Sequence, residues 1–342
     1  MLATPRLEGV RCPLCGAQES RRLVEGKDRL MGVPGAFAIA ECGKCSFLFT
    51  NPRPLVEDLG LCYPPGYGPH RDVAERSGPR VLSGSGSRAL ASRLALAQSL
   101  GYRHLQPEGE LPWSVKLRAK LRAGRLRKRI EPWRGEGRYL DAGCGSGGLL
   151  QKMQSLGWTV SGIEFTEEAA AKARAVTPAL FVGDILDAPF PESSFDLVTC
   201  NHVLEHVPRP LETLAKLIRW LAPGGVLSLE VPNAGGLGPP LFGSCWFSYD
   251  LPRHLLHFTP RTLTQAVEQS GGKVISIHHV ASPSTWRKSL EYQSRERTTA
   301  GRGAGLPGLL ASRPLRGLLR LGAQSAAAMG RGEAIRALIQ RA

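Results

Sequence analysis

The spacing of apolar residues changes along this chain and divides it into segments. From residue 113 to 282, short apolar runs that favour strands alternate with runs whose apolar residues recur every three or four positions. This alternation is typical of an α/β fold, in which helices join the strands of a mostly parallel sheet. The predicted strands are 138–141, 158–164, 180–183, 195–200, 225–231, 273–280 and a last one within 332–339, and the predicted helices are 149–156, 167–176, 211–221 and 262–270.

The other segments have different compositions. Residues 1–55 hold four cysteines in two pairs, and residues 56–112 are rich in Gly, Pro, Ser and Tyr, which predicts loops that serve as a linker or a lid. Residues 283–330 are basic and rich in Gly, Ala, Ser and Leu, which predicts an insertion before the last strand. We therefore expect three parts: 1–55, 56–112 and 113–342.

Charge and length narrow the range of environments and partners. The first residues lack the apolar run of a signal peptide, and no apolar run approaches about 20 residues, so we expect a cytoplasmic protein without structural disulfides. The formal net charge is +15, and much of the excess lies in residues 116–129 and 287–341. These basic segments favour an anionic partner, either RNA or a membrane surface to which the protein is peripheral, unless they are simply solvated.

A glycine-rich turn follows the first strand of the α/β region. Gly143, Gly145 and Gly148 fit the spacing G-x-G-x-x-G, and Glu164 ends the next strand, where a carboxylate can hold ribose hydroxyls. Glycine lets the backbone approach a ligand closely, and the helix that follows favours negative groups at its N-terminus. At this point a dinucleotide and S-adenosylmethionine fit equally well.

Three further features separate these two ligands. Asp141 directly precedes the glycines, where a carboxylate can meet an ammonium group, whereas an anion gains nothing beside a pyrophosphate. Asp184 ends the third strand, where it can accept a hydrogen bond from an adenine amino group. The run 195–207 (FDLVTCNHVLEHV) and the turn 223–225 (PGG) then follow in order. Together these motifs of residues 138–231 resemble class I S-adenosylmethionine-dependent methyltransferases of the small-molecule type.

The resemblance implies a Rossmann-like domain with a seven-stranded sheet, and it implies a role for each motif. Glu164 would bind the ribose and Asp184 the adenine, while Asn201 or His202 would lie beside the sulfur that carries the methyl group. The residues that would line the methionine part of the cofactor are Asp141, Gly143, Gly145 and Gly147.

The N-terminal cysteines form two C-x2-C pairs that are separated by 26 residues. Each pair can present two thiolates from one turn, with Gly16 and Gly43 permitting the tight backbone. Four thiolates close a tetrahedral zinc site that leaves no position for a substrate, so the zinc would be structural. The predicted zinc ligands are Cys12, Cys15, Cys42 and Cys45. The alternative is a set of free or redox-active thiols.

The densest polar cluster follows the fifth strand, in residues 246–260 (WFSYDLPRHLLHFTP). It resembles the histidine-bearing loop of bacterial zinc-ribbon methyltransferases, some of which act on deoxysugar nucleotides, but Arg253 replaces the glutamate that precedes the histidine there. A neutral imidazole can take a proton from an attacking hydroxyl or amine. His254 is the first choice for this general base and His206 the second, while His257 is expected to be a packed histidine.

Three functions are compatible with these motifs. The first is methylation of a small or glycan-type acceptor, such as a nucleotide- or lipid-linked sugar. The second is methylation of ribosomal or other RNA, which the net charge of +15 favours. The third is a non-catalytic scaffold that binds the cofactor and docks a partner, and the intact motifs favour it least.

Overall fold

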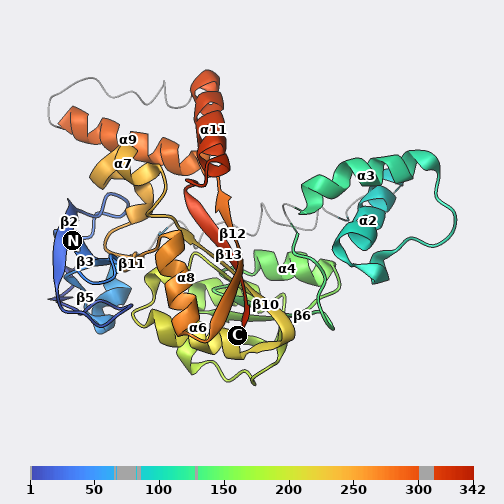
Figure 1. The fold of residues 1–342 in the computed structure, drawn as a ribbon, viewed down its shortest axis with the longest axis horizontal. Coiled ribbons are helices and arrows are strands. Elements are labelled where there is room, and N and C mark those ends of the chain that lie inside the picture. Colours follow the sequence, from blue (N-terminus) through green and yellow to red (C-terminus); the bar gives the residue numbers. More distant parts are fainter. Residues whose placement is uncertain (1, 65–66, 68–81, 83–85, 128–129, 300–311) are drawn as a thin grey trace. The chain divides into compact units, whose positions relative to one another are not determined.

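This computed structural model describes residues 2–64, 67, 82, 86–127, 130–299 and 312–342 (Figure 1). The chain forms two compact units. Unit 1 comprises Met1–Tyr67, Cys200–Ile218 and Leu227–Ala342, and unit 2 comprises Gly68–Thr199 and Arg219–Val226.

A seven-stranded sheet with the strand order β12-β13-β10-β9-β6-β7-β8 confirms the predicted α/β fold class. The pairs β6–β7, β7–β8 and β6–β9 are parallel, whereas β13 runs antiparallel to both β10 and β12. The strands are β6 (Arg138–Ala142), β7 (Thr159–Glu164), β8 (Leu180–Val182), β9 (Phe195–Asn201), β10 (Leu221–Pro232), β12 (Gly272–Val280) and β13 (Ala334–Arg341). Each lies at a predicted position, although β10 begins four residues earlier than expected because Leu221 and Ala222 extend it.

The helices of the α/β region also lie where the apolar spacing places them. They are α4 (Gly148–Ser155), α5 (Glu167–Ala173), α6 (Pro210–Arg219) and α8 (Pro260–Gln269). Helix α8 begins with a side-chain cap, because the Thr259 side chain accepts from Thr262 N and Pro260 occupies the first turn. Within unit 2, Leu150, Leu156 and Trp158 pack on Tyr139 and Leu197 of the sheet, and this core fixes the loop between β6 and α4.

Helix α2 (Ser87–Leu100) corrects the expectation of loops over residues 56–112. It packs against α3 (Trp113–Arg127) through Ala91, Leu94 and Ala95 on one side and Val115 and Ala119 on the other (Figure 1). The glycines, serines and prolines that precede this helix hid its alanine- and leucine-rich periodicity. Two short 3-10 helices, η1 (Val56–Cys62) and η3 (Arg103–Leu105), also lie in this segment. Residues 68–81, 83–85 and 128–129 lie outside the described ranges, so the lid stays a prediction.

In unit 1, the N-terminal segment forms a sheet with the loop that follows β10. This antiparallel sheet has the order β11-β4-β3-β2. Its strands are β2 (Ser20–Gly26), β3 (Phe37–Cys42), β4 (Leu48–Thr50) and β11 (Leu256–His257), and β1 (Leu7–Glu8) pairs separately with β5 (Arg53–Pro54). Thr50 N donates to Leu255 O (2.8 Å), and Thr50 Oγ1 donates to His254 O (2.7 Å). The loop that carries His254 is therefore part of the N-terminal sheet, while domain boundaries at residues 55 and 112 stay predictions.

Two helices of unit 1 form the described part of the expected insertion, and a third helix precedes β12. They are α7 (Gly238–Phe242), which precedes β12, and α9 (Pro283–Thr299) and α11 (Arg313–Ala328), which lie between β12 and β13. The indole nitrogens of Trp246 and Trp286 both donate to the buried Glu333 carboxylate, which anchors this region at the start of β13. Part of the basic segment, residues 300–311, lies outside the described ranges. Within those ranges, no helix has both the length and the apolar character needed to cross a membrane.

Candidate functional site

The glycine-rich turn of unit 2 has the backbone of a ligand cradle. Gly143, Gly145 and Gly147 all have left-handed φ angles of 85°, 54° and 84°. A Cβ added to Gly147 would lie 3.0 Å from the Cα of Ala173, so this glycine is also required by helix packing. A Cβ on Gly145 would meet no atom within 4 Å, so Gly145 borders open space.

Asp141 lies at the end of β6, next to this turn, and is a buried carboxylate. It is 4% exposed, and Thr199 of β9 donates a hydrogen bond to its Oδ1 (2.6 Å). Burial raises the pKa of Asp141 to about 6, although the Thr199 bond opposes the shift, and the charge of Glu164 adds to it. A buried carboxylate in this condition would gain stability from a cationic group placed beside it.

Glu164 is the last residue of β7, and Asp184 follows β8. Glu164 Oε2 accepts from Gly145 N (2.8 Å), which links the acidic end of β7 to the glycine turn. Its Oε1 accepts from both the backbone N and the hydroxyl of Thr166 (3.0 Å each). Asp184 accepts from Leu186 N (2.8 Å) and so caps the 3-10 helix η4 (Ile185–Asp187). The turn, the buried Asp141 and the oriented Glu164 have the chemistry that an amino-acid-bearing nucleoside such as S-adenosylmethionine requires.

A second polar cluster lies in unit 1 and joins Glu205 and His206 of the 3-10 helix η5 (Leu204–His206) with His254. Their potential ligand atoms all lie within 4.8 Å of one another. The imidazole rings of His206 and His254 pack edge to face, 4.6 Å between centroids. Glu205 is 0% exposed, and its Oε2 has no hydrogen-bond partner among the described residues.

Both imidazoles of this cluster are held by backbone carbonyl groups. His254 Nδ1 lies 2.8 Å from Ser248 O, and His206 Nδ1 lies 3.1 Å from Arg253 O and 2.9 Å from the Tyr63 hydroxyl. A carbonyl oxygen can only accept, so these contacts assign the proton of each neutral ring to Nδ1 and leave the lone pair on Nε2. Burial lowers the pKa of His206 to about 4, and His254 lowers it further, so His206 is neutral near pH 7.

His202, which directly follows β9, lies between two carboxylates. Its Nδ1 is 3.3 Å from Glu205 Oε1 and its Nε2 is 3.4 Å from Glu230 Oε1. The imidazole is 54% exposed, and against an opposing effect of desolvation these two carboxylates raise the pKa of His202 to about 10. The φ angle of His202 is 55°, a strained value for a residue with a side chain. Its environment therefore favours an imidazolium rather than a neutral base.

Arg253 is fully buried in unit 1 and positions the loop that carries His254. Its guanidinium bonds both oxygens of Asp28 (2.7 and 2.8 Å) and both oxygens of Asp250 (2.7 to 3.1 Å). Asp28 also accepts from three backbone N–H groups of the turn between β2 and β3. Arg253 stands where the loop that this segment resembles has a glutamate. It is a structural cation that ties this loop to the N-terminal sheet.

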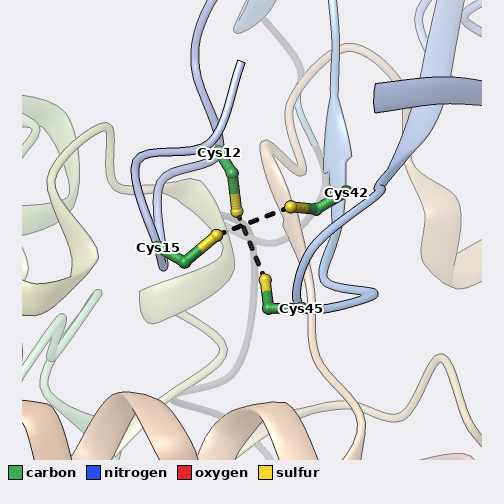
Figure 2. A group of neighbouring side chains, drawn as sticks. All are labelled: Cys12, Cys15, Cys42 and Cys45. Atoms are coloured by element: carbon green, nitrogen blue, oxygen red, sulfur yellow. Dashed lines mark hydrogen bonds between the residues drawn. The ribbon is translucent and has the colours of Figure 1, made fainter. Parts of the chain in front are cut away.

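The four N-terminal cysteines of unit 1 point toward a common centre (Figure 2). Cys12 Sγ lies 3.6 Å from Cys45 Sγ, and Cys15 Sγ lies 3.5 Å from Cys42 Sγ. A tetrahedral zinc site with Zn–S bonds of ~2.3 Å needs sulfurs about 3.8 Å apart, so the donor set fits this metal. In the second pair, Ser46 (φ 55°) rather than Gly43 takes the left-handed backbone that Gly16 (φ 71°) takes in the first.

The structure therefore gathers the predicted residues into three groups. Asp141, the glycines and Glu164 meet in unit 2, whereas the cysteines form one group and the histidines another in unit 1. The sequence analysis did not identify Glu205, Asp250 or Asp28 as members of the histidine group. The spacing His-x-x-Glu-His over residues 202–206 was a signal for Glu205, but nothing in the sequence pairs Asp28 with Arg253.

Comparison with known proteins agrees with this arrangement. Residues 116–277 match the methyltransferase domain family. The chain thus contains a class I methyltransferase domain, the Rossmann-like type that uses S-adenosylmethionine. More particularly, the curated proteins that it matches are O-methyltransferases of ubiquinone biosynthesis.

Individual relatives cover only part of the chain. The ubiquinone biosynthesis O-methyltransferase of Thiobacillus denitrificans is 38% identical over 104 residues, 28% of this chain and 44% of the relative. That of Xanthomonas oryzae pv. oryzae is 34% identical over 130 residues, 35% of this chain and 54% of the relative. The chain therefore spans about half the length of these curated relatives. An S-adenosylmethionine-dependent methyltransferase from Archaeoglobus fulgidus has a TM-score of 0.43 at 21% identity, covering 65% of this chain and 94% of its own.

Proposed function

We propose that this protein transfers a methyl group from S-adenosylmethionine to a hydroxyl oxygen of a small or glycan-type acceptor. The observation that carries this proposal is the buried carboxylate of Asp141 beside an open glycine turn, within the matched methyltransferase domain. The named relatives are O-methyltransferases, which supports oxygen as the acceptor atom.

The cofactor would be held mainly by residues of unit 2. Asp141 would receive the ammonium group of the methionine part, and that contact would relieve the cost of its buried charge. The open space beside Gly145 leaves room for the ligand, Glu164 would accept from the ribose hydroxyls, and Asp184 would accept from the adenine amino group. Asn201 and His202 continue the chain from Thr199, the residue that bonds Asp141, and are the proposed neighbours of the sulfur.

When bound, S-adenosylmethionine supplies a methyl group on a positively charged sulfur. An acceptor oxygen attacks the methyl carbon, the C–S bond breaks with its electrons going to sulfur, and the acceptor hydroxyl must lose its proton. The Nε2 lone pairs of His254 and His206 suit this proton, because the Nδ1 atoms of both rings are already committed to carbonyl oxygens. His254 remains the first choice for the general base that takes this proton.

The four cysteines are proposed to hold one structural zinc ion. The two sulfur–sulfur distances of 3.5 and 3.6 Å and the matching turns of the two pairs support this assignment. Metal analysis of the purified protein should give about one zinc per chain from this site, and the Cys12→Ser variant should lose it.

Cofactor binding tests the first half of the proposal. In calorimetric titration, Asp141→Ala should weaken S-adenosylmethionine binding by about 10- to 100-fold, because a charge-assisted hydrogen bond is worth about 1.5–3 kcal/mol. The control is Asp187→Asn, which removes an exposed acid from the same unit and should bind as the wild type does. Equal affinity of Asp141→Ala and wild type would remove Asp141 from the cofactor site.

Methyl transfer tests the second half. Label from methyl-labelled S-adenosylmethionine should enter a small-molecule extract, and His254→Gln should slow this transfer by about 10²- to 10⁴-fold while cofactor affinity stays the same. The exposed His278→Ala serves as the control. Label that enters RNA and is released by nuclease would instead support the RNA alternative, for which the net charge of +15 is the argument.

A further inference from the structure

The histidine group of unit 1 contains a buried carboxylate oxygen that is not satisfied. Glu205 is 0% exposed, and its Oε2 has no hydrogen-bond partner among the described residues, although its Oε1 faces His202. Leaving a buried acceptor unpaired costs about 1–3 kcal/mol, and more when the group is charged. Such an atom is expected to have a partner outside the described residues, such as a water molecule or an ion.

Two lone pairs accompany this oxygen. The Nδ1 atoms of His206 and His254 lie within hydrogen-bond distance of Arg253 O and Ser248 O, so the lone pair of each neutral ring is on Nε2. A carbonyl group that fixes the ring in this way is the usual support of a metal-binding histidine. The three side chains thus offer one carboxylate and two imidazole donors, with potential ligand atoms within 4.8 Å of one another.

The charges around this group also favour a cation. Glu205 and His254 are accompanied by Asp28, Asp250 and Glu230, whereas the guanidinium groups in contact with these carboxylates are those of Arg253 and Arg336. Four carboxylates against two guanidinium groups leave a negative balance. The balance remains negative whether His202 carries a proton or not.

We propose that Glu205, His206 and His254 bind one divalent transition-metal ion, at a site separate from the four cysteines. Two histidines and one carboxylate form a set that binds such ions and leaves coordination positions open for other ligands. Metal–ligand bonds of about 2.0–2.2 Å bring donor atoms to about 3–3.5 Å from one another. The present donor atoms, within 4.8 Å of one another, would have to move closer by up to about 1–2 Å to bind the ion.

This site rests on the methyl transfer proposed above for its chemical role, and it would take the place of His254 as the means of removing the acceptor proton. In the open positions, the ion would bind the acceptor hydroxyl and lower its pKa, so that the proton leaves to water rather than to His254. The histidines would then hold the ion instead of acting as the base. The proposal also explains why Glu205 is buried beside two histidines with an oxygen left unpaired.

Manganese is the probe for this site, because Mn²⁺ prefers oxygen and nitrogen donors to thiolates and so avoids the cysteine cluster. The zinc-containing protein is treated with a weak chelator and titrated with Mn²⁺, and the loss of the free-ion electron paramagnetic resonance signal measures binding. Wild type should bind about one Mn²⁺ per chain. Glu205→Gln and His254→Gln should each weaken this binding by about 100-fold, and the exposed His278→Ala should not change it.

Two results would overturn the metal site: no Mn²⁺ binding by the wild type, or equal binding by the wild type and His254→Gln. Circular dichroism and zinc content check that each variant is folded, and His254→Gln decides the matter where the buried Glu205→Gln does not fold. Methyl transfer is measured in parallel with and without Mn²⁺. Mn²⁺ binding without any methyl transfer would contradict the proposed function alone, and full transfer without Mn²⁺ binding would contradict the metal site alone.

Discussion

Unit 1 contains two groups of potential metal ligands that differ in almost every respect. The first is the set of four cysteines, whose sulfurs come from two similar turns of the N-terminal segment. The second joins Glu205 and His206 with His254, which is 48 positions further along the chain. Four cysteines would use all four positions of a tetrahedral ion, whereas one carboxylate and two imidazoles would leave positions open. The cysteine group is therefore suited to stabilising the fold, whereas the histidine group is suited to binding a reactant.

The supports of the two groups differ as well. Each cysteine pair is closed by a local backbone bond, Gly16 N to Cys12 O and Ser46 N to Cys42 O. The histidines depend instead on long-range contacts, because the segment of His254 is held by Arg253, which bonds Asp28 of the N-terminal segment. We therefore expect changes in the cysteines to alter stability and changes in the histidines to alter activity. The following predictions test this division.

The largest effect is expected for loss of a cysteine. Cys45→Ser should abolish zinc binding and lower the free energy of unfolding by several kcal/mol, because binding of a structural zinc is worth about 10–16 kcal/mol in small domains. His254→Gln should change the free energy of unfolding by less than about 1 kcal/mol, since among the described residues that side chain makes one hydrogen bond, to Ser248 O. Thermal unfolding with zinc analysis measures both. A stable, zinc-free Cys45→Ser protein would show that the cysteines do not hold the fold.

The second effect concerns the buried cation that ties the His254 loop to the N-terminal sheet. Arg253→Met should lower the free energy of unfolding by about 3–5 kcal/mol, because it leaves the buried Asp28 without its partner. Arg21→Met, which breaks the exposed pair with Glu41, should cost less than about 1 kcal/mol. Denaturant unfolding of both variants makes the comparison. If the two losses were similar, Arg253 would not be the structural link between the His254 loop and the N-terminal sheet.

These differences also explain what the sequence could and could not predict. Local patterns predicted the seven strands of the large sheet, the helices α4, α5, α6 and α8, and the cysteine group, because a C-x2-C spacing or an apolar period acts over a few residues. The pairing of Asp28 with Arg253 joins positions 225 apart, and no local pattern encodes it. Helix α2 was missed because its Ala/Leu period stands beside a Gly- and Ser-rich stretch. The orphaned oxygen of Glu205 depends on burial, which only the folded chain reveals.

Acid should weaken the ion pair between Asp28 and Arg253, with a smaller and reversible loss of stability. Burial alone would raise the pKa of Asp28, but the hydrogen bonds and charge of Arg253 outweigh it and hold the pKa below its usual value. The folded-state pKa is therefore lower than the unfolded one, so the pair stabilises the fold above about pH 4 and loses that contribution as the pH falls further. Wild type should lose stability between pH 5 and 2.5 more steeply than Asp28→Asn. Parallel acid-unfolding curves for the two proteins would contradict this origin of the loss.

The smallest effect is expected for the Tyr63 hydroxyl, which contacts His206 but is not one of the proposed metal ligands. The Tyr63 hydroxyl lies 2.9 Å from His206 Nδ1, but the same nitrogen already has Arg253 O at 3.1 Å. Because the carbonyl alone can fix the tautomer, Tyr63→Phe should cost at most about 1 kcal/mol in unfolding free energy. It should also leave zinc content unchanged and weaken Mn²⁺ binding far less than His254→Gln does. If Tyr63→Phe abolished Mn²⁺ binding while the protein kept its stability, the hydroxyl, and not the carbonyl, would be what orients His206.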